Sequence, residues 1–136
     1  MGFTLREHTA DVAVEATGDS LGGAFAATAD GMAAAMAEEI PEGGERHEIS
    51  ITAEGREALL FDYLDELIYE RDMRSVLPVD NAGRVEQDGG GWQFTGSYRG
   101  VPLAGLRARD LKAVTYSEMD IKETADGWRT YVVFDV

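Results

Sequence analysis

The amino-acid sequence predicts an α+β fold in which two helices pack on a mostly antiparallel β-sheet. Two segments repeat apolar residues at helical spacing, and the second half consists of short β-prone runs separated by turn residues. The order of strand, strand, helix, strand, helix and then several strands also differs from a regular βαβ alternation. With 136 residues and no long linker, we expect a single domain over residues 1–136.

The first half of the chain alternates strands with helices. Alternation of apolar and polar residues predicts strands over residues 3–7, 11–16 and 47–53. A first helix is predicted over residues 21–39, with Asp19 or Ser20 as its N-cap. A second, amphipathic helix is predicted over residues 56–74. Its acidic residues fall mostly on the expected solvent face, so we favour a solvated surface over a metal site for Asp65, Glu66 and Glu70.

Turn residues divide the second half into short runs. The clearest strands are residues 91–98, 112–122 and 128–136, and residues 124–127 form a hairpin turn between the last two. The glycine-rich DGGGW stretch is predicted to be another hairpin turn. It is not a phosphate-binding loop, because it lacks the Lys-Ser/Thr pair of such a loop. The motifs of this half therefore indicate sheet structure and no nucleotide site.

The charge balance restricts the classes of partner. The chain has 26 acidic and 12 basic residues, and its net charge of −14 repels phosphate backbones. We therefore expect no direct binding of nucleic acid. Because the acids are spread along the chain, adaptation to a salt-rich, halophilic cytoplasm explains them better than a local site for metals or basic partners.

Other classes are excluded by what the sequence lacks. The absence of cysteine excludes disulfides, thiolate zinc sites and cysteine nucleophiles. No apolar run approaches the roughly 18 residues that a membrane helix needs, and the amino terminus does not resemble a signal peptide. We expect a cytoplasmic protein without membrane contact.

Two aspartates near opposite ends of the chain are candidate metal ligands. Asp11 lies where the REHTADVAVEA stretch passes into a strand, and Asp135 ends a strand one residue before Val136. If these ends met, the two side chains and the α-carboxylate of Val136 would repel one another. Two like charges about 4 Å apart repel by roughly 1 kcal/mol in water and by about 4 kcal/mol at an effective dielectric constant of 20. Such a cluster requires a cation or proton uptake, and oxygen ligands favour Ca²⁺, Mg²⁺ or Mn²⁺. Periodicity alone leaves open two unrelated strand-end aspartates.

Three longer segments resemble the archease family. EHTADVAVEATGDSLGGAFAATADGM is similar to its opening segment, LLFDYLDELIYERD to its second helix, and LKAVTYSEMDIKETADGWRTYVVFDV to its closing segment. The resemblance covers nearly the whole chain and implies a small two-layer α+β protein. It also implies a protein cofactor, not itself an enzyme, that activates the manganese- and GTP-dependent RtcB-type RNA ligase of tRNA splicing and RNA repair.

The resemblance assigns roles to particular residues. It implies that Asp11 and Asp135 bind a divalent metal, Ca²⁺, Mg²⁺ or Mn²⁺, with the main chain of Val136 nearby. It also implies that the protein promotes guanylylation of the ligase and supports its repeated turnover. His8 and Lys112 belong to the matching segments and are candidate supporting residues. Ser117 stands where many family members have histidine, so a metal or partner role at this position is not carried over.

Two alternatives remain at this point. One is a chaperone or modulator of an RNA-modifying enzyme such as a tRNA methyltransferase, which would not need the aspartates. The other is a metal-dependent hydrolase using His8, Asp11 and Asp135, although the sequence contains no clear nucleophile for it. The sequence leaves open the metal, the oligomeric state, the docking surface and the RNA substrates.

Overall fold

A computed structural model describes the backbone of residues 2–8 and 11–136 and the side chains of residues 2–5 and 11–136. The elements of this part of the chain, in order, are β1 (Gly2–His8), β2 (Asp11–Gly18), α1 (Leu21–Met36), β3 (Glu45–Ala53), α2 (Arg56–Arg74), β4 (Val76–Asp88), β5 (Gly91–Pro102), β6 (Ala113–Val114), β7 (Asp120–Thr124) and β8 (Gly127–Asp135). Within the described residues, neither helix is long and apolar enough to cross a membrane.

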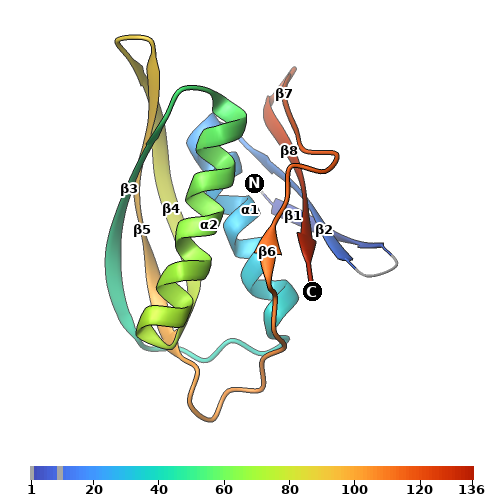
Figure 1. Ribbon diagram of the computed structural model, residues 1–136, viewed down its shortest axis with the longest axis vertical. Coiled ribbons are helices and arrows are strands. Elements are labelled where there is room, and N and C mark those ends of the chain that lie inside the picture. The colour runs from blue at the N-terminus through green and yellow to red at the C-terminus, as the bar shows by residue number, and fades with distance from the viewer. Residues whose placement is uncertain (1, 9–10) are drawn as a thin grey trace.

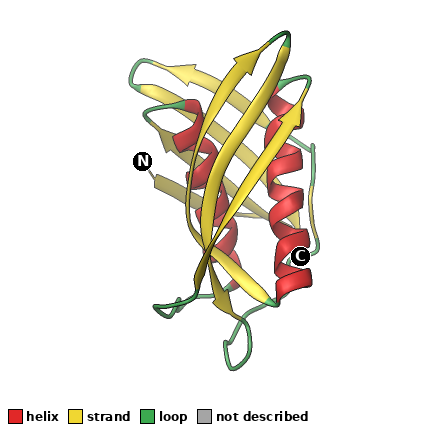
Figure 2. Ribbon diagram, turned by 90° about the vertical axis from the view of Figure 1, so that its left-hand side faces the viewer, coloured by secondary structure: helices red, strands yellow, loops and turns green. Residues whose placement is uncertain are grey.

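The strands divide into two antiparallel sheets, and the helices lie between them (Figure 1). Among the described residues, one sheet has the order β1-β2-β8-β6, with β7 also paired to β8, and the other has the order β3-β5-β4. Figure 2 shows the helices side by side against the strands. The predicted α+β class with helices packed on antiparallel strands is therefore confirmed, although the strands form two sheets and not the single sheet that the sequence suggested.

Helix α1 begins as predicted but ends earlier. The Ser20 side chain accepts a hydrogen bond from the backbone N–H of Gly23 at 3.0 Å and caps the helix, as expected of an N-cap serine. The predicted end at residue 39 is wrong, because Ala37 is already extended. The carbonyl of Met36 accepts a hydrogen bond from the N–H of Arg109 at 2.7 Å. The loop that contains Arg109 thus pairs with one of the last backbone carbonyls of the helix.

Helix α2 has the predicted bounds, but one of its acids is not solvated. Glu70 has a side chain only 14% exposed, which accepts hydrogen bonds from the Tyr98 hydroxyl and from Arg74 Nε at 2.9 Å. Burial raises the pKa of Glu70, but the hydrogen bonds from Tyr98 and Arg74, together with the charges of Arg74 and His47, outweigh it and the net shift is downward. The predicted solvated face holds for the exposed Asp65 and not for Glu70.

The strands of the second half differ from the prediction in two places. β4 runs continuously through Pro78, with a register shift between Val79 and Ala82, where sequence punctuation suggested separate short runs. The predicted strand over residues 112–122 is wrong, because a turn divides it into β6 and β7. In that turn the N–H of Met119 donates to the carbonyl of Tyr116 at 3.1 Å, and Glu118 has a positive φ of 57°. The predicted hairpin between β7 and β8 is confirmed.

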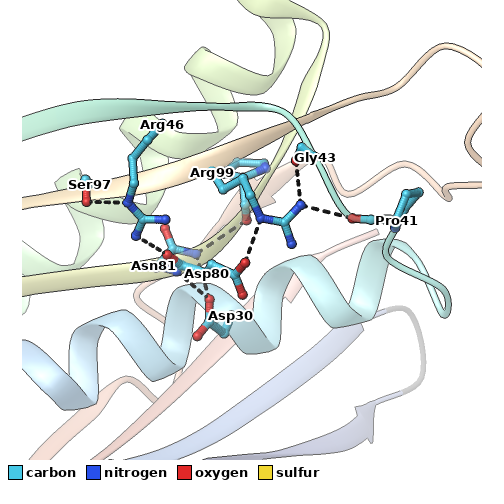
Figure 3. Close-up of polar contacts among 9 residues, drawn as sticks. Asp30, Pro41, Gly43, Arg46, Asp80, Asn81, Ser97 and Arg99 are labelled. Carbon is cyan, nitrogen blue, oxygen red and sulfur yellow. Dashed lines mark hydrogen bonds and ion pairs between the residues drawn. The ribbon is translucent and has the colours of Figure 1, made fainter.

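A polar cluster joins α1 to the irregular part of β4 (Figure 3). Asp30 on α1 accepts hydrogen bonds from both the backbone N–H and the side-chain amide of Asn81, each at 2.9 Å. Next to it, Asp80 pairs with Arg99, whose guanidinium also donates to the carbonyls of Pro41 and Gly43. The cluster thus ties the helix, the β4 bulge and the loop before β3 together.

Asp30→Asn is expected to remove a pH-dependent part of stability while keeping an acceptor for Asn81. Burial raises the pKa of Asp30 above its usual value of 3.8 and outweighs the two hydrogen bonds from Asn81, which lower it. Smaller effects of Asp80, which raises the pKa, and of Arg46, which lowers it, oppose one another. The folded state therefore binds this proton more tightly, and protonation of Asp30 adds stability as pH falls from its folded pKa towards 3.8. Urea unfolding of both proteins between neutral and mildly acidic pH measures this component. The same pH slope in both proteins would contradict it.

Candidate functional site

The end of the five-stranded sheet brings together the two predicted metal ligands. In the register of the antiparallel β2–β8 pair, Asp11 lies directly opposite Asp135. The same row continues to His8 in β1 and to Ala113 in β6. Figure 1 shows the C-terminus at this end of the sheet. The amino- and carboxyl-terminal motifs, 124 residues apart by the difference between positions 135 and 11, thus meet through strand pairing.

Alternation along these strands places both aspartates on one face. Val12 and Val14 lie opposite Phe134 and Val132, and all four side chains are buried. Asp11 and Asp135, one position away, therefore project to the other face of the sheet. Directly opposed residues of an antiparallel pair have Cβ atoms about 4.5–5.5 Å apart. With Asp11 half-buried and Asp135 exposed, two carboxylates share an accessible strand end.

The neighbouring loop fixes the main chain at Asp135. The backbone N–H of Lys112 donates to the carbonyl of Asp135 at 2.8 Å, while the Lys112 side chain is exposed. Val136 follows and is 37% exposed. Ser117 lies elsewhere, in the turn between β6 and β7, where its N–H donates to Thr115 Oγ1 at 3.2 Å. The side chain of His8 lies outside the described residues, so its predicted supporting role stays a prediction.

Sequence reasoning missed the residue that anchors this loop. The buried Arg71 of α2 donates to the carbonyl of Leu111 at 2.8 Å and contacts Met36 Sδ at 3.2 Å. It also lies 3.6 Å from a carboxylate oxygen of Asp110. Arg71 thus holds the segment that leads into Lys112. Its burial has no signal in the sequence, where it reads as one more charge near the end of an amphipathic helix.

An open groove of about 950 Å³ lies on the other side of the same strand end. The residues that line it include the apolar Leu5, Val12 and Leu106. Charged residues of both signs also line it, namely Glu38, Glu39, Arg107 and Arg109. Because Val12 faces inward and Asp11 outward, this groove does not contain the paired carboxylates. The candidate site is a surface site.

The donor set fits a hard cation with open coordination positions. Among the side chains that the structure describes, no three His, Cys, Asp or Glu residues are grouped so that they enclose a metal ion. Asp11 and Asp135 provide two side-chain carboxylates at this strand end, directly opposite one another. Mg²⁺ is commonly held by one or two carboxylates and several waters, and Ca²⁺ also accepts main-chain carbonyls and water. Remaining positions of such a site would be completed by solvent or by another molecule.

These features define a small α+β protein whose paired carboxylates lie at an exposed strand end. The chain belongs to the archease family, since the model of the Archease protein family matches residues 3–136. The protein archease of Thermococcus kodakarensis is 33% identical over 135 residues, which cover 96% of this chain and 95% of that protein. Protein archease of Pyrococcus furiosus is 32% identical over 136 residues, with the same coverage.

Solved structures support the same relationship. The solution structure of Methanobacterium thermoautotrophicum protein 1598 has a TM-score of 0.86 and 29% identity, and the match covers 99% of both chains. The crystal structure of an archease from Thermotoga maritima, described as a possible chaperone, has a TM-score of 0.63. At 24% identity, over 96% of this chain and 94% of that one, the second likeness shows the fold alone.

Proposed function

We propose that this archease is a protein cofactor that activates an RtcB-type RNA ligase through a divalent cation bound by Asp11 and Asp135. The observation that carries the proposal is the direct pairing of these two residues at an accessible strand end. A net charge of −14 disfavours contact with RNA itself, so the proposal places the partner among proteins. The resemblance described above supplies the identity of that partner.

The residues of this chain have defined tasks in the proposal. Asp11 and Asp135 hold the ion, with the main chain of Val136 beside them, and the β2–β8 register fixes the spacing of the two aspartates. The Lys112 N–H holds the carbonyl of Asp135 and so restricts the end of β8. A bound divalent cation supplies charge neutralisation and stabilises negative charge on a phosphoryl group.

Activation also requires a preference between states of the ligase. A protein cofactor shifts a conformational equilibrium only by binding one state more tightly than the other. In this proposal the acidic strand end favours the ligase state that is competent for guanylylation, which restores the enzyme for further turnovers. Archease itself carries out no covalent step.

The test is multiple-turnover RNA ligation by the cognate ligase with GTP and Mn²⁺ at high salt. Wild-type archease is expected to raise the turnover rate, and Asp135→Ala is expected to leave the rate near that of the ligase alone. Asp126→Ala, which removes an exposed aspartate from the β7–β8 hairpin, is the matched control and should activate normally. No change in rate with wild-type protein would refute the activator function.

A chaperone or modulator of a tRNA-modifying enzyme such as a methyltransferase is the alternative. The observation that favours it is the presence of exposed large apolar side chains, such as Tyr69 and Met73, on this chain. Its signature is suppressed aggregation of the client enzyme on heating. This activity should persist in a protein with both Asp11→Asn and Asp135→Asn, since a holdase needs exposed apolar surface and no cation.

A further inference from the structure

The outer face of α2 carries exposed apolar side chains that take no part in the candidate metal site. Among the described residues, the most exposed large hydrophobic side chains are Met73 at 65%, Tyr69 at 55% and Tyr116 at 53%. Tyr69 and Met73 are one helical turn apart. Tyr116 lies against the same helix, because its ring stacks on that of Phe61 with centroids 4.2 Å apart. Figure 1 shows α2 at the front of the molecule, beside β6.

Three carboxylates lie among these apolar side chains. Asp62, Asp65 and Glu66 precede Tyr69 by seven, four and three residues, and this spacing places them on the same side of α2. We call the surface formed by Asp62, Asp65, Glu66, Tyr69, Met73 and Tyr116 the α2 face. Asp62 lies close enough to Tyr116 for its charge to contribute, after burial, to a raised pKa of the Tyr116 hydroxyl.

The negative charge of the α2 face is not neutralised within the described part of the chain. The nearest arginines of the helix are engaged elsewhere, Arg71 with Asp72 and Arg74 with Glu70. No ion pair joins Asp62, Asp65 or Glu66 to a base of the described residues. Burial first, and then repulsion from Glu70 and Asp65, raises the pKa of Glu66. An approaching cation would therefore relieve repulsion that the fold leaves in place.

The combination selects one kind of occupant. Aromatic residues and methionine are enriched in the binding cores of protein interfaces. An RNA backbone or an anionic lipid surface would be repelled by the carboxylates. A second copy of this chain would place like charges opposite one another, which costs several kcal/mol in an interface. A protein segment with lysine or arginine beside an aliphatic side chain satisfies both parts of the surface.

We propose that the α2 face is a docking surface for a basic segment of a partner protein, with aliphatic anchors seated between Tyr69, Met73 and Tyr116. The three carboxylates pair with its lysines or arginines. This docking surface is distinct from the strand-end carboxylates and requires no metal ion. It therefore stands or falls independently of the proposed cation site.

The test is a titration of the ¹⁵N-labelled protein with a synthetic amphipathic peptide of about 15 residues, or four helical turns, bearing leucine and lysine on one face. Resonances of residues 62–73 and of Tyr116 are expected to shift most. Asp65→Lys with Glu66→Lys, and separately Tyr69→Ser with Met73→Ser, are each expected to weaken binding at least tenfold. The matched control, Glu123→Lys with Asp126→Lys on the β7–β8 hairpin, makes the same charge change and should alter affinity less than twofold.

Several results would overturn the docking surface. Equal weakening by the hairpin control would show that only net charge attracts the peptide. Equal binding of a peptide with glutamate in place of lysine would show that charge complementarity plays no part. Saturating Mg²⁺ that fully displaces the peptide while shifting the same resonances would show an ion-attracting surface only. Shifts centred outside the α2 face, or stronger binding by a single-stranded RNA, would place the site or the partner class elsewhere.

Discussion

Asp135→Asn is expected to raise the melting temperature of the metal-free protein and to abolish the further rise that divalent cations give the wild type. Like charges directly opposite on paired strands destabilise a sheet, and asparagine removes this repulsion between positions 11 and 135. A cation that binds only the folded state adds about 2.7 kcal/mol at a hundred times its Kd. Relative to the wild type, the substitution is therefore expected to raise stability without metal and to lower it when a divalent cation is bound.

Thermal melts in chelator and in Ca²⁺, Mg²⁺ or Mn²⁺, together with calorimetric titration of each ion, measure both effects without any ligase. Asp126→Asn provides a control that lowers the net negative charge equally at an exposed hairpin. Asp11→Asn should reproduce the Asp135→Asn result, since both carboxylates are needed. If the wild type and Asp135→Asn gain the same stability from cations, the strand-end carboxylates do not form the cation site.

The parts of the fold predicted best from sequence are those governed by local periodicity. Helix α2 has the predicted bounds, because its apolar residues repeat at helical spacing and bury one face. The end of α1 was misplaced because the alanine-rich pattern favours a longer helix, whereas Ala37 is already extended and the Met36 carbonyl bonds to a loop residue, Arg109, that is distant in sequence. Pro78 and the turn residues at positions 81–83 made β4 read as several pieces in the sequence. The structure instead has a register shift between Val79 and Ala82, and such a bulge does not end a strand.

The candidate site depends on contacts that local patterns do not encode. Pairing of β2 with β8 joins the two ends of the chain, so periodicity left the approach of Asp11 to Asp135 undetermined, and family resemblance was needed to expect it. The donation from Lys112 to Asp135 and the anchoring of its loop by Arg71 are equally nonlocal. The residue types thus indicated which chemistry the strand end could carry. The contacts that hold this strand end in place could not be predicted from the sequence.

Glycine at the start of α1 illustrates how a long-range contact overrides local preference. The backbone of α1 at Gly22 lies in close contact with the backbone of β4. A Cβ atom added there would lie 2.5 Å from the Cα atom of Arg84 and 2.6 Å from the carbonyl oxygen of Gly83, both backbone atoms of β4. Backbone atoms cannot move aside as a flexible side chain can, so the helix and the strand would have to separate.

Gly22→Ala is therefore expected to destabilise the fold by about 3 kcal/mol, as overpacking of a close contact typically does. Helix propensity alone predicts the opposite sign, a gain of about 1 kcal/mol from replacing glycine by alanine. Urea unfolding separates the two effects, and Gly55→Ala is the control, because an added Cβ there meets no atom within 4 Å. The control should lose no more than about 1 kcal/mol, because alanine is a poorer N-cap than glycine but its Cβ crowds no neighbouring atom. A Gly22→Ala protein as stable as the wild type would mean that α1 and β4 are able to separate at little cost, and that their close approach does not help to fix the sheet opposite β2 and β8.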